Sequence, residues 1–107
     1  MRIAHRGDWR AAPENTLAAL RAALSRPGCD GVEFDVRAAS DGVPVLLHDE
    51  TLQRVQGVPA RVSDLTAAEL SDHGVPSLAG VLADVGRGPF VDVELKEWVS
   101  AAVDVLE

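Results

Sequence analysis

The stretch Gly31-Val32-Glu33-Phe34-Asp35-Val36-Arg37 decides the fold, because it alternates apolar and charged residues as a β-strand with one buried face does. Side chains point to opposite faces of a strand in turn, so its three apolar residues face one way and its three charged residues face the other. Glu33 and Asp35 would then lie roughly 6 to 7 Å apart. At a partly buried site with an effective dielectric constant of about 20, their charges repel by about 2 to 3 kcal/mol. Folding gains nothing from this repulsion, whereas a bound cation would remove it; the alternative is an edge strand with a solvated polar face.

The composition indicates one soluble globular domain covering residues 1–107, with 47% hydrophobic and 25% charged residues. A formal net charge of -7 and a pI near 4.8 argue against a surface that binds nucleic acid or anionic membranes. No apolar run approaches the roughly 20 residues of a membrane span, and no charged-then-apolar leader precedes the first strand, so we expect a cytoplasmic protein. The single cysteine, Cys29, permits no internal disulfide and is expected to be a small buried thiol.

The first third of the chain predicts a strand, a helix and the central strand. The first strand covers residues 2–7 and ends in His5, Arg6 and Gly7. A helix follows, with Asn15 as its expected N-cap and with Leu17, Leu20 and Leu24 on one side. Pro27 and Gly28 end this helix before the central strand begins.

The remainder of the chain alternates in the same way. After the Ser40-Asp41-Gly42 turn, residues 43–49 read as a second strand that ends in His48 and Asp49, and residues 50–65 read as a loop. A capping box over residues 66–69 opens a short helical turn, and Ser77 caps a helix that ends at Gly86 and Gly88. Residues 90–96 repeat the parity of the central strand, and the tail is expected to form an amphipathic helix carrying Trp98, Val99, Ala102, Val103 and Leu106.

Strands that alternate with helices predict right-handed βαβ units and a parallel sheet covered by helices. The fold class is therefore α/β, of the (β/α)8 TIM-barrel type, and the chain is expected to cover about the first four β/α units. The carboxyl ends of barrel strands line the active site. Four strand ends carry chemistry here: His5 with Arg6, Glu33 with Asp35, His48 with Asp49, and Glu94 with Lys96.

Two histidines, three carboxylates, an arginine and a lysine suit the hydrolysis of a phosphodiester. The oxygen ligands of Glu33, Asp35 and Glu94 favour Ca²⁺ or Mg²⁺, which would polarise a phosphoryl oxygen. Arg6 and Lys96 could hold the other phosphate oxygens, the arginine by its planar fork. His5 and His48 could exchange protons with the attacking and leaving oxygens, a role worth roughly 10² to 10⁴ in rate.

The sequence resembles the glycerophosphodiester phosphodiesterase family in seven short pieces whose order and spacing agree along nearly the whole chain. They are His5-Arg6-Gly7, Pro13-Glu14-Asn15-Thr16, Glu33-Phe34-Asp35-Val36, Asp41-Gly42-Val43-Pro44-Val45, His48-Asp49 followed by Leu52 and Arg54, Pro76-Ser77-Leu78, and Val93-Glu94-Leu95-Lys96. Each piece alone is a weak signal, and together they are a strong one.

The resemblance implies a metal-dependent enzyme that cleaves small-molecule glycerophosphodiesters into glycerol 3-phosphate and an alcohol, in lipid metabolism. It implies that His5 and His48 are the acid/base pair, that Glu33, Asp35 and Glu94 hold the metal, and that Arg6 and Lys96 contact phosphate. Two further groups are expected to support the site. Glu14 and Asn15 would do so from the first helix, with a solvated helix cap as the alternative, and Asp49 would orient His48 or its loop rather than bind the metal.

The family's barrel takes roughly 220 to 250 residues, so this chain corresponds to about half of one. Half a barrel leaves its first and last strands as unpaired edges. Three explanations are open: a piece of a longer protein, a degraded or truncated gene, and a half barrel that pairs with a second copy as a homodimer. Two alternatives to the leading function also remain, namely a non-catalytic half barrel that binds a metal or a phosphate-containing ligand, and a phospholipase D-like phosphodiesterase. The lack of an apolar loop or basic patch for approaching a bilayer argues against the last of these.

Overall fold

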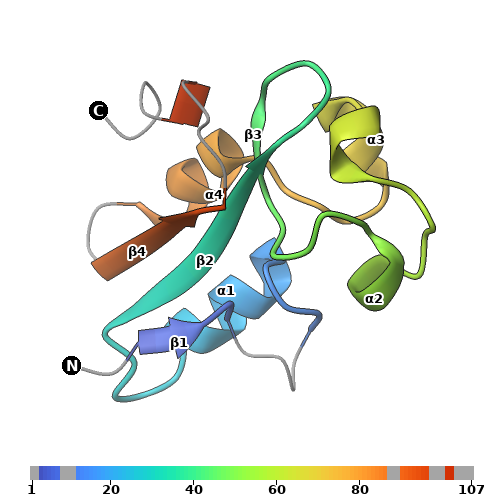
Figure 1. Ribbon diagram of the computed structural model, residues 1–107. Coiled ribbons are helices and arrows are strands. Elements are labelled where there is room, and N and C mark those ends of the chain that lie inside the picture. Colours follow the sequence, from blue (N-terminus) through green and yellow to red (C-terminus); the bar gives the residue numbers. More distant parts are fainter. Residues whose placement is uncertain (1–2, 8–11, 87–89, 97–100, 103–107) are drawn as a thin grey trace.

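The computed structural model describes residues 3–7, 12–86, 90–96 and 101–102, and for Phe90 and Val91 it describes the backbone alone (Figure 1). The strands are β1 (Ile3–His5), β2 (Gly31–Ala38), β3 (Pro44–Leu46) and β4 (Phe90–Leu95). The helical elements are α1 (Leu17–Leu24), α2 (Gln53–Gln56), the 3₁₀ turn η1 (Val62–Asp64), α3 (Ala67–Asp72) and α4 (Leu78–Val85). Among the described helices, none combines the length and the apolar character needed to cross a membrane.

Strand β2 is the centre of the sheet, as its sequence pattern predicts (Figure 1). It pairs in parallel with β1 along one edge, from Ile3 opposite Gly31 to His5 opposite Glu33. Along its other edge it pairs in parallel with β4, from Phe90 opposite Gly31 to Leu95 opposite Val36. Two βαβ units are therefore present. Their strands place His5 opposite Glu33 and Glu94 opposite Asp35.

Strand β3 runs antiparallel to β2, which corrects the expectation of a further parallel strand. Ala38 faces Pro44, and the intervening turn is closed by hydrogen bonds from the Ala39 amide to the Val43 carbonyl and from the Gly42 amide to the Ala39 carbonyl. A connection this short can reverse the chain but cannot return it in the same direction, since a parallel crossover needs a dozen or more residues. The described residues thus contain three parallel strands, which is consistent with part of a barrel but does not confirm four β/α units.

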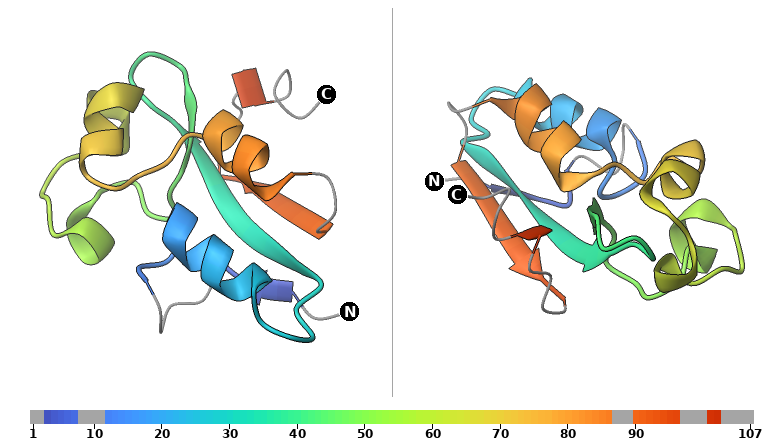
Figure 2. Two further views of the ribbon diagram at one scale, coloured as in Figure 1. Left: turned by 180° about the vertical axis from the view of Figure 1, so that it is seen from behind. Right: turned by 90° about the horizontal axis from the view of Figure 1, so that it is seen from above.

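Helices α1 and α4 cover the same face of the sheet (Figure 2). Val32, Phe34 and Val36 of β2 point into this layer and are fully buried, as the alternation predicts. They pack against Leu20 and Ala23 of α1, Leu46 of β3, Leu78 and Val81 of α4, and Ala102. Cys29 lies at the margin of this first core, partly buried. Burial of each large apolar side chain in this core stabilises the folded protein by about 1.5 to 3 kcal/mol. Because this face of β2 supplies the packing, the opposite face can carry charged residues.

A second core lies beside the sheet, under α2, η1 and α3. Strand β3 joins the two cores, because Leu46 packs into the first while Val45 and Leu47 pack into the second. Leu52 and Val62 are buried in the second core, so residues 50–65 include α2 and η1 rather than forming the expected uninterrupted loop. This core fixes the segment that carries His48.

The helix caps agree with the sequence except at α1. Thr66 and Glu69 form both hydrogen bonds of the expected capping box, and Ser77 caps α4, which ends at Gly86 with a φ of 75°. The N-cap of α1 is Thr16, whose side chain accepts a hydrogen bond from the Ala19 amide; the expectation of Asn15 was wrong. Of the expected C-terminal helix, only residues 101–102 lie within the described part of the chain, and they are helical.

Candidate active site

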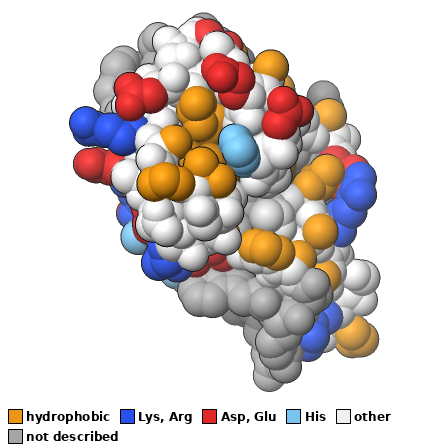
Figure 3. All heavy atoms as spheres, turned by 90° about the vertical axis from the view of Figure 1, so that its right-hand side faces the viewer, with side chains coloured by type: hydrophobic (Ala, Val, Ile, Leu, Met, Phe, Trp, Pro, Cys, Tyr) orange, Lys and Arg blue, Asp and Glu red, His pale blue; other side chains and the backbone are white. Residues whose placement is uncertain are grey.

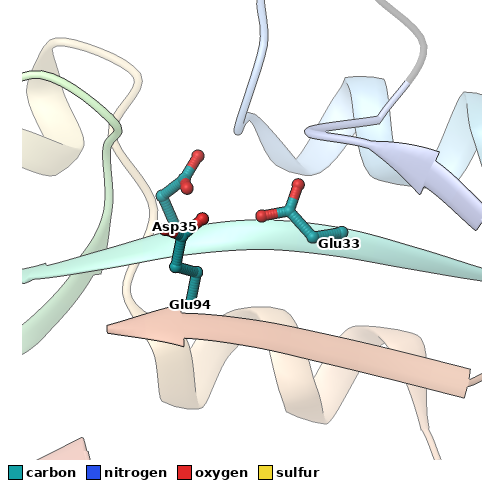
Figure 4. Close-up of side chains that lie close together, drawn as sticks. All are labelled: Glu33, Asp35 and Glu94. Carbon is teal, nitrogen blue, oxygen red and sulfur yellow. The ribbon is translucent and has the colours of Figure 1, made fainter. Parts of the chain in front are cut away.

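Three carboxylates meet on the face of the sheet opposite α1 and α4 (Figure 4). Glu33 and Asp35 come from β2, and Glu94 comes from β4, where the register places it directly opposite Asp35. One carboxylate oxygen of each residue lies within 4.8 Å of those of the other two. The predicted metal-binding set is therefore brought together, and its geometry could hold one cation.

The two carboxylates on β2 are buried, and their pKa values shift in opposite directions. Burial, followed by the neighbouring charge of Asp35, raises the pKa of Glu33 above its usual value. Burial also acts to raise the pKa of Asp35, which is fully buried. The hydrogen bond from Asn15 and the positive charges of Arg6 and Lys96 outweigh that effect and hold the pKa of Asp35 below its usual value. Folding thus favours the ionised form of Asp35 and disfavours that of Glu33.

Replacing Glu33 with glutamine is expected to stabilise the metal-free protein at neutral pH. Because folding raises the pKa of Glu33, the stability contributed by its protonated form is present below the unfolded-state pKa and is lost as the pH rises through the folded-state pKa. Glutamine keeps the shape without the charge, so the unfolding free energies of the two proteins should agree near about pH 4 and diverge towards about pH 7. Denaturant unfolding in the presence of chelator measures both.

Asp92→Asn is the matched control for this comparison. Asp92 faces Glu33 in the strand register but is exposed, so its substitution should change stability by less than about 0.5 kcal/mol at either pH. A Glu33→Gln protein that is less stable than wild type at about pH 7 without metal would contradict the pKa direction given for Glu33.

The end of β1 brings His5 and Arg6 to the acidic cluster. His5 Nε2 lies 3.0 Å from Glu33 Oε2, and Arg6 Nε lies 3.0 Å from Asp35 Oδ2. Arg6 has a φ of 60°, in the left-handed region that non-glycine residues seldom adopt outside turns and functional sites. Gly7 follows with a φ of 87°, and a Cβ there would lie 2.7 Å from the backbone of Ala19 in α1. Only glycine fits this close approach, which fixes the backbone position of the neighbouring Arg6.

His48 and Asp49 follow β3 and form a hydrogen-bonded pair, with 2.8 Å between His48 Nδ1 and Asp49 Oδ1. The hydrogen bonds from Arg54, together with the one from His48, hold the pKa of Asp49 well below its usual range, so its carboxylate is an acceptor only. His48 Nδ1 must then carry the proton, which in the neutral ring leaves Nε2 as the basic nitrogen. Arg37 donates two hydrogen bonds, of 3.0 and 2.7 Å, to the His48 carbonyl and fixes the backbone.

Glu14 and Asn15 are buried and contact residues of the candidate site, so they do not form the solvated helix cap that was the alternative. Asn15 is buried with a φ of 55°, donates to Asp35 Oδ2 at 3.1 Å, and accepts from the Asp35 amide at 3.3 Å. Glu14 is buried and accepts hydrogen bonds from Arg6 and Arg54. Both residues therefore hold groups of the site rather than the helix.

Lys96 lies at the end of β4, and its amide donates to the Val36 carbonyl at 3.0 Å. Its Nζ lies 2.9 Å from Glu94 Oε1 and 3.6 Å from Asp35 Oδ1. The hydrogen bond with Glu94 raises the pKa of Lys96, so the ammonium is positively charged at neutral pH. It is the second cation, with Arg6, on the rim of the acidic cluster.

Sequence reasoning gave no role to two arginines that the structure places in the site. Arg37 has the same strand parity as Glu33 and Asp35, a signal that could have found it. Arg54 belongs to the quoted His48-Asp49 piece, but its partner Glu14 lies 40 residues away, so only the folded chain reveals the contact.

A pocket of about 440 Å³ elsewhere in the described part of the chain does not belong to this site. It is lined by residues that include Pro13, Leu17, Val55, Gln56 and His73, and no carboxylate is among them. Figure 3 shows the side of the molecule that bears α2 and α3, where a group of hydrophobic side chains lies beside a histidine. The residues lining the pocket include no carboxylate, arginine or lysine, so this pocket does not fit the chemistry of the acidic cluster.

Comparisons with known proteins identify similar sequences. The family model described as "Glycerophosphoryl diester phosphodiesterase family" matches residues 5–104. A glycerophosphodiester phosphodiesterase of Caldanaerobacter subterraneus is 37% identical over 91% of this chain and 45% of its own length. Glycerophosphodiester phosphodiesterase 1 of Rattus norvegicus is 55% identical over 60% of this chain and 19% of its own length.

Solved structures match over nearly the whole chain. A glycerophosphodiester phosphodiesterase from Agrobacterium tumefaciens superposes with a TM-score of 0.86 at 36% identity, over 99% of this chain and 52% of that one. An Oleispira antarctica phosphodiesterase in complex with the product sn-glycerol-3-phosphate superposes with a TM-score of 0.80 at 32% identity, over 99% of this chain and 51% of that one. The chain thus spans at most about half the length of these relatives.

Proposed function

Because this chain belongs to the glycerophosphoryl diester phosphodiesterase family, we propose that the protein hydrolyses glycerophosphodiesters to glycerol 3-phosphate and an alcohol with a divalent cation as cofactor. The observation that carries the proposal is the cluster of Glu33, Asp35 and Glu94 between a histidine and two cationic side chains. Within this cluster, folding disfavours the charge of Glu33, which a bound cation would stabilise.

The carboxylate oxygens fit Ca²⁺ or Mg²⁺. Glu33 Oε1 and Asp35 Oδ1 are buried and accept no hydrogen bond from the described part of the chain. A buried anionic oxygen that accepts no hydrogen bond is costly, even with the Lys96 ammonium 3.6 Å from Asp35 Oδ1, and a hard cation would satisfy it. Asp35 Oδ2 already contacts Asn15 and Arg6, so Oδ1 is the atom left to face a metal. Such an ion, when bound by Glu33, Asp35 and Glu94, would polarise a phosphoryl oxygen and offset the negative charge that builds up during the reaction.

Arg6 and Lys96 would orient the phosphate. Both lie beside the acidic cluster, and the Arg6 side chain is held by Glu14 and Asp35 at 3.1 and 3.0 Å. A guanidinium fixed by two carboxylates loses little further freedom when it binds an oxyanion. The Lys96 ammonium contributes a compact charge from the neighbouring strand.

The two histidines would carry the proton transfers. An oxygen nucleophile attacks phosphorus and loses its proton to one imidazole nitrogen, while the bond from phosphorus to the alcohol oxygen breaks and the other histidine donates a proton to that oxygen. His48 is suited to either step, because Asp49 holds its Nδ1 proton and leaves Nε2 to accept or donate. His5 is exposed, and its Nε2 lies beside Glu33 Oε2.

The test is release of glycerol 3-phosphate from glycerophosphocholine with Ca²⁺, with Mg²⁺ and with chelator. We expect release with metal and at least about a 10³-fold lower rate with chelator, because loss of metal removes several kcal/mol of transition-state stabilisation. Micellar phosphatidylcholine in a parallel assay separates this activity from that of a phospholipase D-like enzyme. Equal rates with and without chelator would contradict the proposal, and metal binding without release would favour a non-catalytic binding role.

A further inference from the structure

Arg54 occupies a position between the two halves of the candidate site. On one side, its Nε donates to Asp49 Oδ2 at 2.7 Å and its Nη2 lies 3.1 Å from Asp49 Oδ1. On the other side, its Nη1 and Nη2 donate to the two oxygens of Glu14 at 2.6 and 3.0 Å. The guanidinium is therefore bidentate to two carboxylates at once, which a lysine ammonium could not reproduce.

These contacts continue in both directions and form a chain of alternating charge. Asp49 accepts from the His48 ring, and Glu14 accepts from Arg6, which in turn contacts Asp35. We define this set as the charge chain, and its members in spatial order are His48, Asp49, Arg54, Glu14, Arg6 and Asp35. It links the acid/base histidine to a metal-binding carboxylate through side chains drawn from four separate segments of the sequence.

The burial of Glu14 shows why Arg54 matters. The side chain of Glu14 is only 5% exposed, whereas that of Arg54 is 49% exposed. A buried carboxylate must be paired, and Glu14 has two arginines as partners. Arg54 itself is at the surface, so its contribution to folding is expected to be small compared with its effect on the orientation of Asp49 and Glu14.

We propose that Arg54 is a positioning residue for catalysis, which orients His48 through Asp49 and Arg6 through Glu14. The proposal rests on the function proposed above. Without Arg54, Asp49 is free to rotate away from His48 Nδ1, and the ring can then exchange between its two neutral tautomers. At the same time Glu14 loses one of its two arginine partners, and its carboxylate is then paired with Arg6 alone.

The decisive variant is Arg54→Met, which keeps the length of the side chain and removes its charge. We expect kcat to fall about 10- to 100-fold, as it does when outer-shell partners of a site are removed. The KM should change less than about threefold, because no contact to substrate is lost. Nitrogen NMR of the His48 imidazole, recorded without substrate, should show the Nδ1-protonated tautomer in the wild type and a mixture of tautomers in the variant. Arg54→Lys should recover part of kcat, since an ammonium can reach one carboxylate but not both.

Arg21→Met is the matched control. Arg21 is also bidentate to an acid, Asp84, but this pair joins α1 to α4 on the surface away from the site. Its substitution should leave kcat and the His48 tautomer unchanged. Equal loss of kcat in both arginine variants would overturn the proposal, and so would a fall in kcat with an unchanged His48 tautomer, because Arg54 would then act other than through Asp49.

A double-mutant cycle tests the second arm of the charge chain. Arg54→Met and Glu14→Gln should be strongly non-additive in kcat, because both interrupt the same connection to Arg6. Additive losses would overturn this arm. If the wild type shows no turnover at all, the proposed function fails while the tautomer comparison still decides whether Arg54 orients His48, so the two failures are distinguishable.

Discussion

Replacing His48 with alanine is expected to lower kcat for glycerophosphodiester hydrolysis by about 10² to 10⁴ while leaving Ca²⁺ or Mg²⁺ binding largely intact. The ring contacts Asp49, whereas Glu33, Asp35 and Glu94 form the acidic cluster, so these carboxylates keep their surroundings when the ring is removed. The side chain is one third exposed, and its loss leaves no cavity in either core. Steady-state kinetics measures the first effect, and calorimetric titration with metal measures the second.

His73→Ala serves as the control for this experiment. His73 caps the C-terminus of α3, is exposed, and lies in none of the contacts of the site. Its substitution should leave kcat within a factor of about two, as expected for a surface change. Retention of more than about a tenth of the wild-type rate by His48→Ala would count against general acid/base catalysis at this position.

Replacing Asp35 with asparagine is expected to abolish metal binding and turnover and also to destabilise the protein. Asp35 is fully buried, and its charge balances Arg6 and Lys96, which would lose their shared counter-ion. Breaking a buried ion pair by removing one partner costs about 3 to 5 kcal/mol, so the metal-free variant should unfold at a clearly lower denaturant concentration. The substitution leaves the shape of the side chain unchanged, so the loss would be electrostatic.

Asp72→Asn, at the exposed end of α3, is the control and should change stability by less than about 0.5 kcal/mol. The contrast with Glu33 is the sharper test, since the two acids are two residues apart on one face of β2. Without metal, Glu33→Gln should gain stability where Asp35→Asn loses it, because folding raises the pKa of the first and lowers that of the second. If the two substitutions changed stability in the same direction, the pKa direction given for one of the two acids would be contradicted.

The central strand and its two faces could be predicted from the sequence because the information is local. Alternation over residues 31–37 predicts which side chains face the helix layer and which face the candidate site, and β4 has the same parity, with Glu94 opposite Asp35. The direction of β3 was missed, although the short turn before it excludes a parallel return. The single-turn elements α2 and η1 are too short to show a period, and Leu52 and Val62 gain their burial from a core that only the folded chain assembles.

The residues of the candidate site could be named from the sequence, but their contacts could not be predicted from it. The family resemblance named the three carboxylates, both histidines, Arg6 and Lys96, and the structure gathers the carboxylates with His5, Arg6 and Lys96. It could not show that Asn15 leaves the capping of α1 to Thr16 and binds Asp35 instead. Such contacts join segments 20 to 40 residues apart, and no local pattern encodes them.

The short turn that joins the antiparallel strands β2 and β3 also influences the order in which the molecule folds. Ala38 meets Pro44 after a few residues of chain, whereas Gly31 meets Phe90 only across more than half of the sequence. Closing the shorter loop costs about 2 kcal/mol less in chain entropy, so the hairpin can form well before β4 docks. Pulsed hydrogen exchange during refolding should therefore protect the Leu47 amide, bonded to the Asp35 carbonyl, earlier than the Lys96 amide, bonded to the Val36 carbonyl. Simultaneous protection of the two amides would contradict this order. In the expected order, the segment carrying His48 is in place first, and the strand carrying Glu94 completes the site last.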